Sequence, residues 1–234
     1  MASGQLTTAN GSPEARVPLS RDRVLAGAIT VADCGGIGAL TIRTLAAELG
    51  VKPMSVYHYI ANKDDIIDAV VDLVFSEIEL PKPGNDWQLE MRRRAMSARR
   101  VLVRHPWAIP LLQSRTSPGP ATLSHHNAFI GTLFMAGFSV KMVAHAFALI
   151  DSYVYGFALS EKALPIHSPE PVTDTAVSMM VQYFTHEYPH LLRFTTEHVI
   201  QPGYDFGDEF EYGLDLILDG LAESIRADST EFTA

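Results

Sequence analysis

Helical periodicity runs through nearly the whole chain after Ser20, and this feature most constrains the fold. Apolar residues recur there at intervals of three and four, and no segment shows the alternation of a half-buried strand. Hydrophobic residues make up 47% and charged residues 19% of the 234 residues, which is enough apolar material for a buried core. We therefore predict an all-α protein.

Caps and breaks divide this region into helices. Ser20 is a suitable N-cap for a first helix over 21–34, and Thr41 caps a short helix that Gly50 ends. A third helix starts near Pro53, and Asn62 caps a long helix to about residue 78. After a break at 81–85, which is a plausible linker, we expect helices at 86–104, 106–113, 119–136, 139–163, 171–187 and 206–226. The stretches 164–171 and 201–203 are expected to be loops.

The first three helices have the ingredients of a helix-turn-helix. Ala46 is small where two helices would cross, Gly50 tolerates the positive φ of a turn, and Val56 can pack the third helix onto the second. The outer side of the third helix offers groups that reach a major groove or a phosphate. These are Met54, Ser55, Tyr57, His58 and Tyr59. The alternative is three packed short helices without a DNA role.

The charge distribution fits contact with phosphates at one end. The net charge is −9, but residues 1–63 carry six Arg or Lys against four Asp or Glu, a balance of +2. The remaining residues carry twelve against twenty-three, a balance of −11. A mildly basic N-terminal segment on an acidic body suits a protein that meets nucleic acid at that end only.

The segments Leu40–Val51, Ser55–Tyr59 and Asn62–Ile66 together resemble the DNA-binding domain of the TetR (tetracycline-repressor) family, over about residues 20–67. The resemblance implies that Thr41 and Arg43 start the positioning helix, near the DNA backbone and base edges. It places four residues at the base-facing start of the recognition helix, namely Lys52, Pro53, Met54 and Ser55. It also implies phosphate contacts from Tyr57, Tyr59 and Lys63.

The rest of the chain, over about 84–226, is similar to the C-terminal domain of the tetracycline-repressor branch. The matching features are Trp87 before an Arg-rich helix, His105-Pro106-Trp107, Gly137-Phe138-Ser139, Phe210–Leu214 and Gly220-Leu221. The resemblance implies dimerisation through the helices at 139–163 and 206–226 as a four-helix bundle. The residues favour this independently, because Gly213 and Gly220 would admit a partner helix beside an apolar stripe. The stripe comprises Phe210, Leu214, Ile217, Leu221 and Ile225.

The same resemblance disfavours tetracycline as the ligand. The family histidine that helps to bind the drug's magnesium falls at Leu112, the pocket asparagine and phenylalanine at Arg94 and Ala98, and the glutamine at Phe129. We expect a more apolar or aromatic ligand instead. Its candidate contacts are Met96, Arg100, Trp107, Leu112, Phe129, Leu133 and Phe147. The alternative is that these residues are simply core.

Other polar groups are given structural interpretations. Arg93, Arg100 and Arg104 share one helix face and could hold an anion, but a solvated face paired with acidic residues is favoured. A metal site is disfavoured, since Pro189 interrupts the His186/His190 pair. Cys34 is the single cysteine, so no intrachain disulfide can form, and we expect it to pack as a small apolar residue.

We therefore predict a flexible tail at 1–19, a helix-turn-helix domain at 20–66, a helical ligand-binding and dimerisation domain at 67–226, and a tail at 227–234. The expected function is a cytoplasmic TetR-type regulator, in its simplest form a repressor. It would bind palindromic operator DNA as a homodimer and be released by a small molecule, without a cofactor, metal or membrane. Neither a phosphate loop nor a nucleophile elbow indicates an enzyme. The alternative is a helical small-molecule-binding protein that does not read DNA.

Overall fold

The computed structural model describes residues 18–114, 117–164 and 188–231, and these residues form helices and no strands. The helices are α1 (Arg21–Gly35), α2 (Ile42–Glu48), α3 (Pro53–Val56), α4 (Lys63–Ser76), α5 (Trp87–Arg104), α6 (Ile109–Ser114), α7 (Pro120–Met135), α8 (Val140–Ala163), α10 (Pro189–Phe194) and α11 (Glu209–Glu231). Short 3-10 turns lie at Ile37–Ala39, Pro106–Ala108 and Phe206–Asp208, and a π turn at Thr195–Val199. The prediction of an all-α protein is confirmed.

The helix boundaries follow from side-chain caps. The side chains of Ser20, Asn62 and Ser139 each accept a hydrogen bond from the backbone N–H three residues later, at the N-termini of α1, α4 and α8. Gly50 and Gly137 take φ values of 65° and 92° after α2 and α7, a region that side chains other than glycine rarely adopt. The local sequence therefore determines where most of these helices begin and end.

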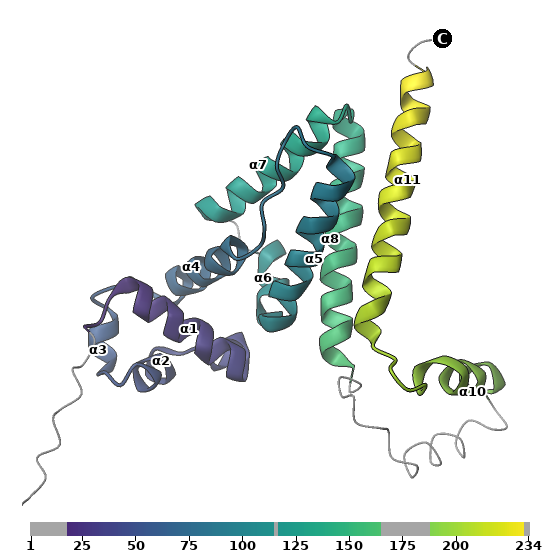
Figure 1. The fold of residues 1–234 in the computed structure, drawn as a ribbon. Coiled ribbons are helices and arrows are strands. Elements are labelled where there is room, and N and C mark those ends of the chain that lie inside the picture. Colours follow the sequence, from purple (N-terminus) through teal and green to yellow (C-terminus); the bar gives the residue numbers. More distant parts are fainter. Residues whose placement is uncertain (1–17, 115–116, 165–187, 232–234) are drawn as a thin grey trace, which may run out of the picture.

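Helices α1, α2 and α3 form a small unit at one end of the molecule (Figure 1). Its centre is apolar, with Val24, Leu45 and Val56 each fully buried. Gly27 lies where α1 meets α2, and a side chain there would collide with Leu49. The close approach of these helices fixes how α3 is presented to solvent.

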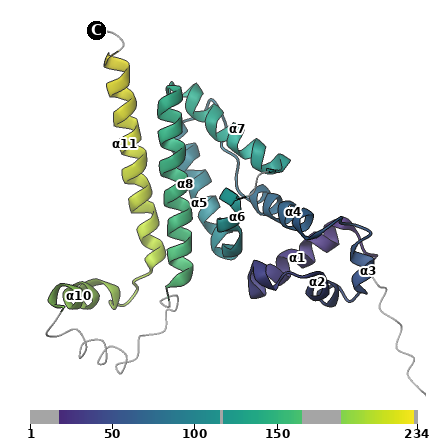
Figure 2. The same ribbon diagram turned by 180° about the vertical axis from the view of Figure 1, so that it is seen from behind.

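Helix α4 connects this unit to the larger domain (Figures 1 and 2). It packs against both α1 and α7. The Asp72 carboxylate accepts hydrogen bonds from the backbone N–H groups of Ala121 and Thr122, at 3.1 and 2.8 Å, and from the Thr122 hydroxyl at 2.9 Å. Asp72 therefore caps the N-terminus of α7 from another helix. Gly119 lies against the same carboxyl group, where a larger residue would not fit.

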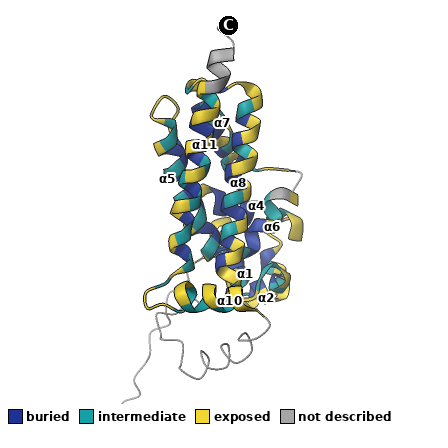
Figure 3. Ribbon diagram, turned by 90° about the vertical axis from the view of Figure 1, so that its right-hand side faces the viewer, coloured by how far each residue is buried: buried dark blue, intermediate teal, exposed yellow. Residues whose placement is uncertain are grey.

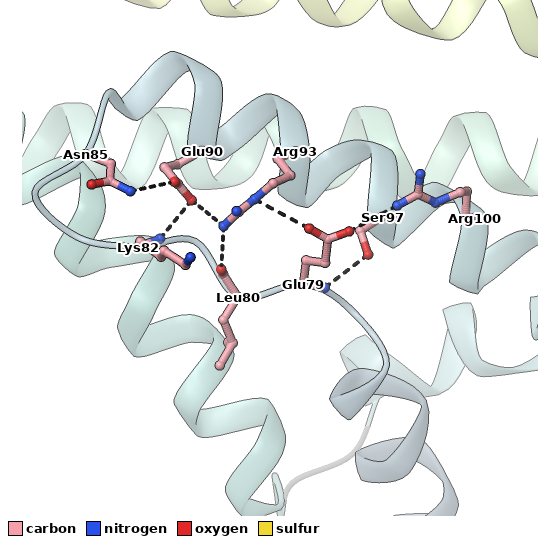
Figure 4. A network of polar contacts seen from close by, with 8 residues as sticks. All are labelled: Glu79, Leu80, Lys82, Asn85, Glu90, Arg93, Ser97 and Arg100. Atoms are coloured by element: carbon pink, nitrogen blue, oxygen red, sulfur yellow. Dashed lines mark hydrogen bonds and ion pairs between the residues drawn. The ribbon is translucent and has the colours of Figure 1, made fainter.

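The connection between α4 and α5 is bound to α5 along its length (Figure 4). The buried Glu90 carboxylate accepts hydrogen bonds from the Lys82 backbone N–H and the Asn85 amide, both at 2.9 Å, and pairs with Arg93 at 2.6 Å. The hydrogen bond from Asn85, opposed by burial, lowers the pKa of Glu90. The predicted break at 81–85 is thus a structured turn that holds α5 in place.

Helices α5, α8 and α11 form the main layer of the larger domain, and α7 packs across α5 and α8. Among the described helices, α8 is the one whose length and apolar composition would allow it to span a membrane. It also buries two carboxylates, those of Asp151 and Glu161, and both are paired with arginines of α5. Its packing against three helices, together with these ion pairs, identifies α8 as a core helix.

Three expectations from the sequence were wrong and one lies outside the described residues. The apolar stripe on α11 faces its own protomer, since Phe210 and Leu214 are fully buried and Gly213 makes room for Tyr153. Cys34 is exposed rather than packed. The sequence predicted no helix near 189–199, where α10 and a π turn lie. The predicted helix at 171–187 lies outside the described residues.

Replacing Asp72 with alanine should destabilise the fold. The change removes the cap of α7 and leaves two backbone N–H groups without their acceptor, so we expect a loss of about 1–2 kcal/mol in the free energy of unfolding. Urea denaturation at one fixed protein concentration measures this loss. Glu48→Ala, on the exposed side of α2, is the control and should leave the free energy nearly unchanged. Equal stability of both variants would contradict the role of Asp72.

Candidate nucleic-acid interface and ligand site

Helix α3 (Pro53–Val56) is anchored by one residue, and Tyr57, His58 and Tyr59, which the sequence placed on this helix, lie in the turn after it. Val56 is fully buried, whereas Met54 is 71% exposed and Tyr57 49% exposed. His58 is exposed as well. Lys52 precedes the helix in an extended conformation, and Pro53 is its first residue. Proline has no backbone N–H, and at this position an N–H would have no acceptor within the helix. A short helix held from one side and open on the other is suited to a major groove.

Among the other predicted DNA contacts, some side chains are exposed, one hydroxyl is engaged in a helix cap, and two residues are half-buried. Arg43 and Lys63 are exposed at the starts of α2 and α4. The Thr41 hydroxyl is already engaged, because Thr41 and Thr44 cap α2 reciprocally. Ser55 and Tyr59 are half-buried, and Tyr59 packs against the apolar core. The ten predicted residues therefore remain candidates as a group, and all of them except Ser55 and Tyr59 are exposed.

The seven predicted ligand contacts do not form one group. Phe129 and Leu133 are fully buried on α7, and Phe147 of α8 packs on Phe129 with ring centroids 5.1 Å apart. Met96 and Arg100 instead line an open groove of about 680 Å³ on the outer side of α5. Leu112 is half-buried on α6, and Trp107 lies where α1 meets the larger domain.

Trp107 belongs to a joint between the two parts of the chain. Its indole N–H donates to Asp33 of α1 at 2.7 Å, and Nδ1 of His105 lies 2.7 Å from the same carboxylate oxygen. The other nitrogen of His105 lies 3.6 Å from Glu77, just after α4. These contacts hold α1 against the end of α5, so the position of the small unit depends on the larger domain.

A buried polar cluster lies inside the larger domain. The Arg94 guanidinium of α5, 1% exposed, donates to Asp151 of α8 at 2.6 Å and stacks over the Phe129 ring at 4.8 Å. The Tyr155 hydroxyl donates to the second oxygen of Asp151 at 3.1 Å. Burial and the neighbouring carboxylate raise the pKa of Tyr155, so it remains a donor. One positive and one negative charge are thus balanced in the core.

The side chain of His125 on α7 is also part of this cluster. It is 1% exposed, and neither ring nitrogen has a partner in hydrogen-bond geometry. Burial and then the charge of Arg94 lower the pKa of His125 to about 4, and an interaction with the Ile78 carbonyl only partly opposes this. The imidazole is therefore neutral at pH 7. Its ring lies edge-on to Phe75 of α4, with centroids 5.6 Å apart.

The outer arginines of α5 are engaged in ion pairs. Arg93 and Arg100 both pair with Glu79, and Arg104 pairs with Glu77 at 2.6 Å. Arg92 pairs with Glu211 and Asp215 of α11. This arrangement agrees with a solvated face neutralised by acidic residues, rather than with an anion site.

The sequence analysis identified Phe129 and Phe147 but missed the polar members of the buried cluster. One indication was available: Asp151 is a carboxylate in the middle of a long apolar helix, and such a group is rarely buried without a cation. Its partner could not be deduced, because Arg94 is one of six arginines in a single helix. No metal-binding group of three or more ligands occurs in the part of the chain that the structure describes.

A helix-turn-helix joined by one helix to a larger helical domain defines the class of protein, a DNA-binding regulator with a separate effector domain. Comparisons with known proteins agree. Residues 24–70 match the family described as bacterial regulatory proteins of the tetR family, and residues 80–225 match the tetracyclin repressor-like C-terminal domain.

Similar proteins include an HTH-type transcriptional regulator of Saccharopolyspora erythraea, 30% identical over 87% of this chain and 85% of the relative. The HTH-type transcriptional repressor DrrR1 of Streptomyces coeruleorubidus is 28% identical over 87% of this chain and 77% of the relative. The fold resembles apo ActR of Streptomyces coelicolor, with a TM-score of 0.70, 24% identity and coverage of 91% of this chain and 99% of ActR.

The chain belongs to the TetR family of transcriptional regulators. The predicted family and the resemblance of the C-terminal domain to the tetracycline-repressor branch are confirmed. The family is one of regulators and not of enzymes, so the prediction that this chain is not an enzyme is confirmed as well.

The buried imidazole makes folding sensitive to acid. Between about pH 6.5 and about pH 4 the unfolded chain binds a proton on His125 that the folded chain does not, so stability falls as pH drops through this range. The full contribution is up to about 3 kcal/mol. His125→Phe should remove this part of the acid loss, which urea denaturation at pH 7, 5.5 and 4.5 would measure.

The matched control is His190→Phe, on an exposed position of α10, which should keep the pH dependence of the wild type. An acid loss in His125→Phe as large as that of the wild type would contradict the assignment of this effect to His125.

Proposed function

We propose that this protein is a ligand-responsive repressor that binds palindromic operator DNA as a homodimer in the cytoplasm and leaves the DNA when a small molecule binds inside the larger domain. The observation that carries the proposal is the exposed recognition helix α3, held by a buried Val56 within a family-matched helix-turn-helix. The assignment as a repressor is supported by DrrR1, a relative that is itself a repressor.

DNA contact would divide into two kinds. Met54 and Ser55 at the start of α3 would reach base edges and read sequence. Tyr57 and Lys63 would contact phosphates, and Lys63 would do so at the N-terminus of α4, where backbone N–H groups also favour anions. Phosphate contacts set affinity, whereas base contacts set preference.

The homodimer is supported by two exposed stripes on the outer side of the long helices. On α8, small residues recur at every fourth position, and on α11 larger and small residues do the same. The stripes comprise Ala144, Ala148, Ser152 and Gly156 on α8, and Tyr212, Leu216, Gly220 and Ser224 on α11. Figure 3 shows exposed residues along both helices, seen from the side of α11. Small residues on one helix would admit the larger ones of a partner in a four-helix bundle.

Release would follow from a shift between two arrangements of the dimer. Two recognition helices can enter successive major grooves only at a separation of about 34–36 Å. A ligand that binds better to an arrangement with another separation lowers the DNA-bound population. Helix α4 would transmit this change, because its Phe75 contacts His125 in the core while its N-terminus follows α3.

The function is tested by selection of DNA from a random pool with the full-length protein, followed by binding of the selected palindrome at several salt concentrations. Lys63→Ala should weaken binding to all selected sequences and reduce the salt slope by about 2, one phosphate contact for each protomer. Met54→Ala should instead change the preferred bases in each half-site. Lys141→Ala, far from α3 at the start of α8, is the control. Recovery of no specific sequence would overturn the proposal.

Leu216→Glu tests the dimer. Leu216 is 59% exposed on α11, and a two-fold interface would bury the new charge twice. We expect the dissociation constant of the dimer, measured by analytical ultracentrifugation, to rise about 100-fold or more. Binding to the operator should be lost in parallel. Leu123→Glu, on a leucine of α7 that is 55% exposed, should leave the dimer intact. An intact Leu216→Glu dimer would exclude this face as the interface.

A further inference from the structure

Helix α1 is held at its two ends by different parts of the chain. At its start, the Arg21 guanidinium donates to the Tyr59 carbonyl in the turn after α3, and Arg23 donates to the Leu49 carbonyl at the end of α2, both at 3.2 Å. Asp33 lies near the other end of α1, about 18 Å away along the helix axis. There it contacts the larger domain. Helix α1 therefore spans the distance between the turn after α3 and the larger domain.

The contact at Asp33 is directional and shielded from water. One oxygen of its carboxylate lies 2.7 Å from the indole nitrogen of Trp107 and 2.7 Å from Nδ1 of His105. An ionised carboxylate can only accept, so Nδ1 must be the nitrogen of His105 that carries the proton. Trp107 is 6% exposed and His105 7% exposed. Hydrogen bonds to a charged acceptor in such surroundings are strong and fix the direction of the groups that they join.

The donors at this joint belong to a rigid part of the larger domain. The backbone N–H of His105 donates to the Val101 carbonyl of α5 at 3.0 Å, and the N–H of Ala108 donates to the His105 carbonyl at 2.9 Å. Pro106 begins the 3-10 turn that carries Trp107, so this turn continues directly from α5. Helix α5 packs against α8, one of the two helices of the proposed dimer interface. Asp33 thus connects α1 to the layer that would hold the two protomers together.

Helix α4 alone would not fix the orientation of the small unit. The buried residues of α4 are all apolar, and apolar contacts are non-directional, so they oppose rotation less than separation. A second attachment away from the axis of α4 removes this freedom. A rotation of about 10° about the Asp33 end of α1 would move the other end by about 3 Å. One base pair changes the separation of two half-sites by about 3.4 Å, so the two displacements are comparable.

We infer that Asp33 is a positioning residue that determines which spacing of operator half-sites the dimer accepts, through its hydrogen bonds with Trp107 and His105. This role rests on the proposed function, because it concerns how a homodimer meets a palindrome. Asp33 does not touch DNA in this role. It fixes the two small units at one separation, and without it each unit turns about α4 and accepts several spacings.

The first measurement compares operators that differ only in spacing. The palindrome selected by the full-length wild-type protein is altered so that its half-sites are one base pair closer together or farther apart. We expect the wild type to bind the selected spacing about tenfold or more tightly than either altered spacing. Asp33→Ala should reduce this preference to less than about threefold and leave the preferred bases within each half-site unchanged, since no base contact is altered.

Trp107→Phe gives an independent test of the same joint. It keeps an aromatic ring in place but removes the N–H group, and it should also weaken the preference for one spacing. The matched control is Asp22→Ala, which removes an exposed carboxylate from the other end of α1 and should keep the wild-type preference. If Asp33→Ala does not fold, Trp107→Phe alone decides by the same criterion.

The second measurement needs no DNA. Nitroxide labels are attached at Glu48→Cys, on the exposed side of α2, in a Cys34→Ser background, and double electron–electron resonance gives the distance between the two labels of a dimer. Asp33→Ala and Trp107→Phe should each broaden the distribution of distances about twofold or more, because the small unit is then less restrained. The double variant should broaden it little further, since both changes break one joint.

A wild type without a preferred spacing, a preference that survives in both variants, or distributions that stay as narrow as that of the wild type would each overturn the role of Asp33. With specific binding of the palindrome by the wild type, these results leave the proposed function intact. Absence of specific DNA binding by the wild type instead overturns the proposed function, whatever the distances between the labels show.

Discussion

Helix α4 is shared between the small unit and the larger domain, and the rest of the structure depends on how it is held. Its N-terminus is capped by Asn62, a short turn after α3, and its apolar side is buried against both α1 and α7. Near its other end, Asp72 supplies the cap that α7 lacks in its own sequence, because Gly119 precedes Pro120 there. A helix held at both ends in this way provides the proposed route from α7 to the DNA-binding unit.

The buried ion pair in the core is difficult to explain by stability. Replacing such a pair with apolar residues of similar volume is often neutral or stabilising, whereas removing one partner is strongly destabilising. The pair of Arg94 and Asp151 is accompanied by a neutral His125 that has no hydrogen-bond partner and costs stability in acid. Groups that are expensive to bury and converge on one place are characteristic of binding sites.

Local chemistry made much of the fold predictable, because caps and glycines act within a few residues of where they stand. Ser20, Asn62 and Ser139 start helices as expected, and Gly50 and Gly137 end them. Periodicity was less informative on α11, which is apolar on two sides. Phe210 and Leu214 face the protomer, and Tyr212 and Leu216 face solvent. A pattern shows that a face is apolar but not what covers it. The cluster in the core escaped prediction because Arg94 and Asp151 are 57 residues apart.

Charge is distributed in a way that separates the two kinds of recognition. The acidic residues belong mostly to the larger domain, where the outer arginines of α5 pair with Glu77, Glu79 and Glu211. The excess of negative charge there would repel DNA from that domain, while Arg43 and Lys63, the proposed phosphate contacts, are exposed at the opposite end. The interior, by contrast, is electrically balanced. The charges that would orient the protein on DNA are therefore separate from the polar groups of the core, and the two parts of the chain are linked both through α4 and through the contacts of Asp33 with His105 and Trp107.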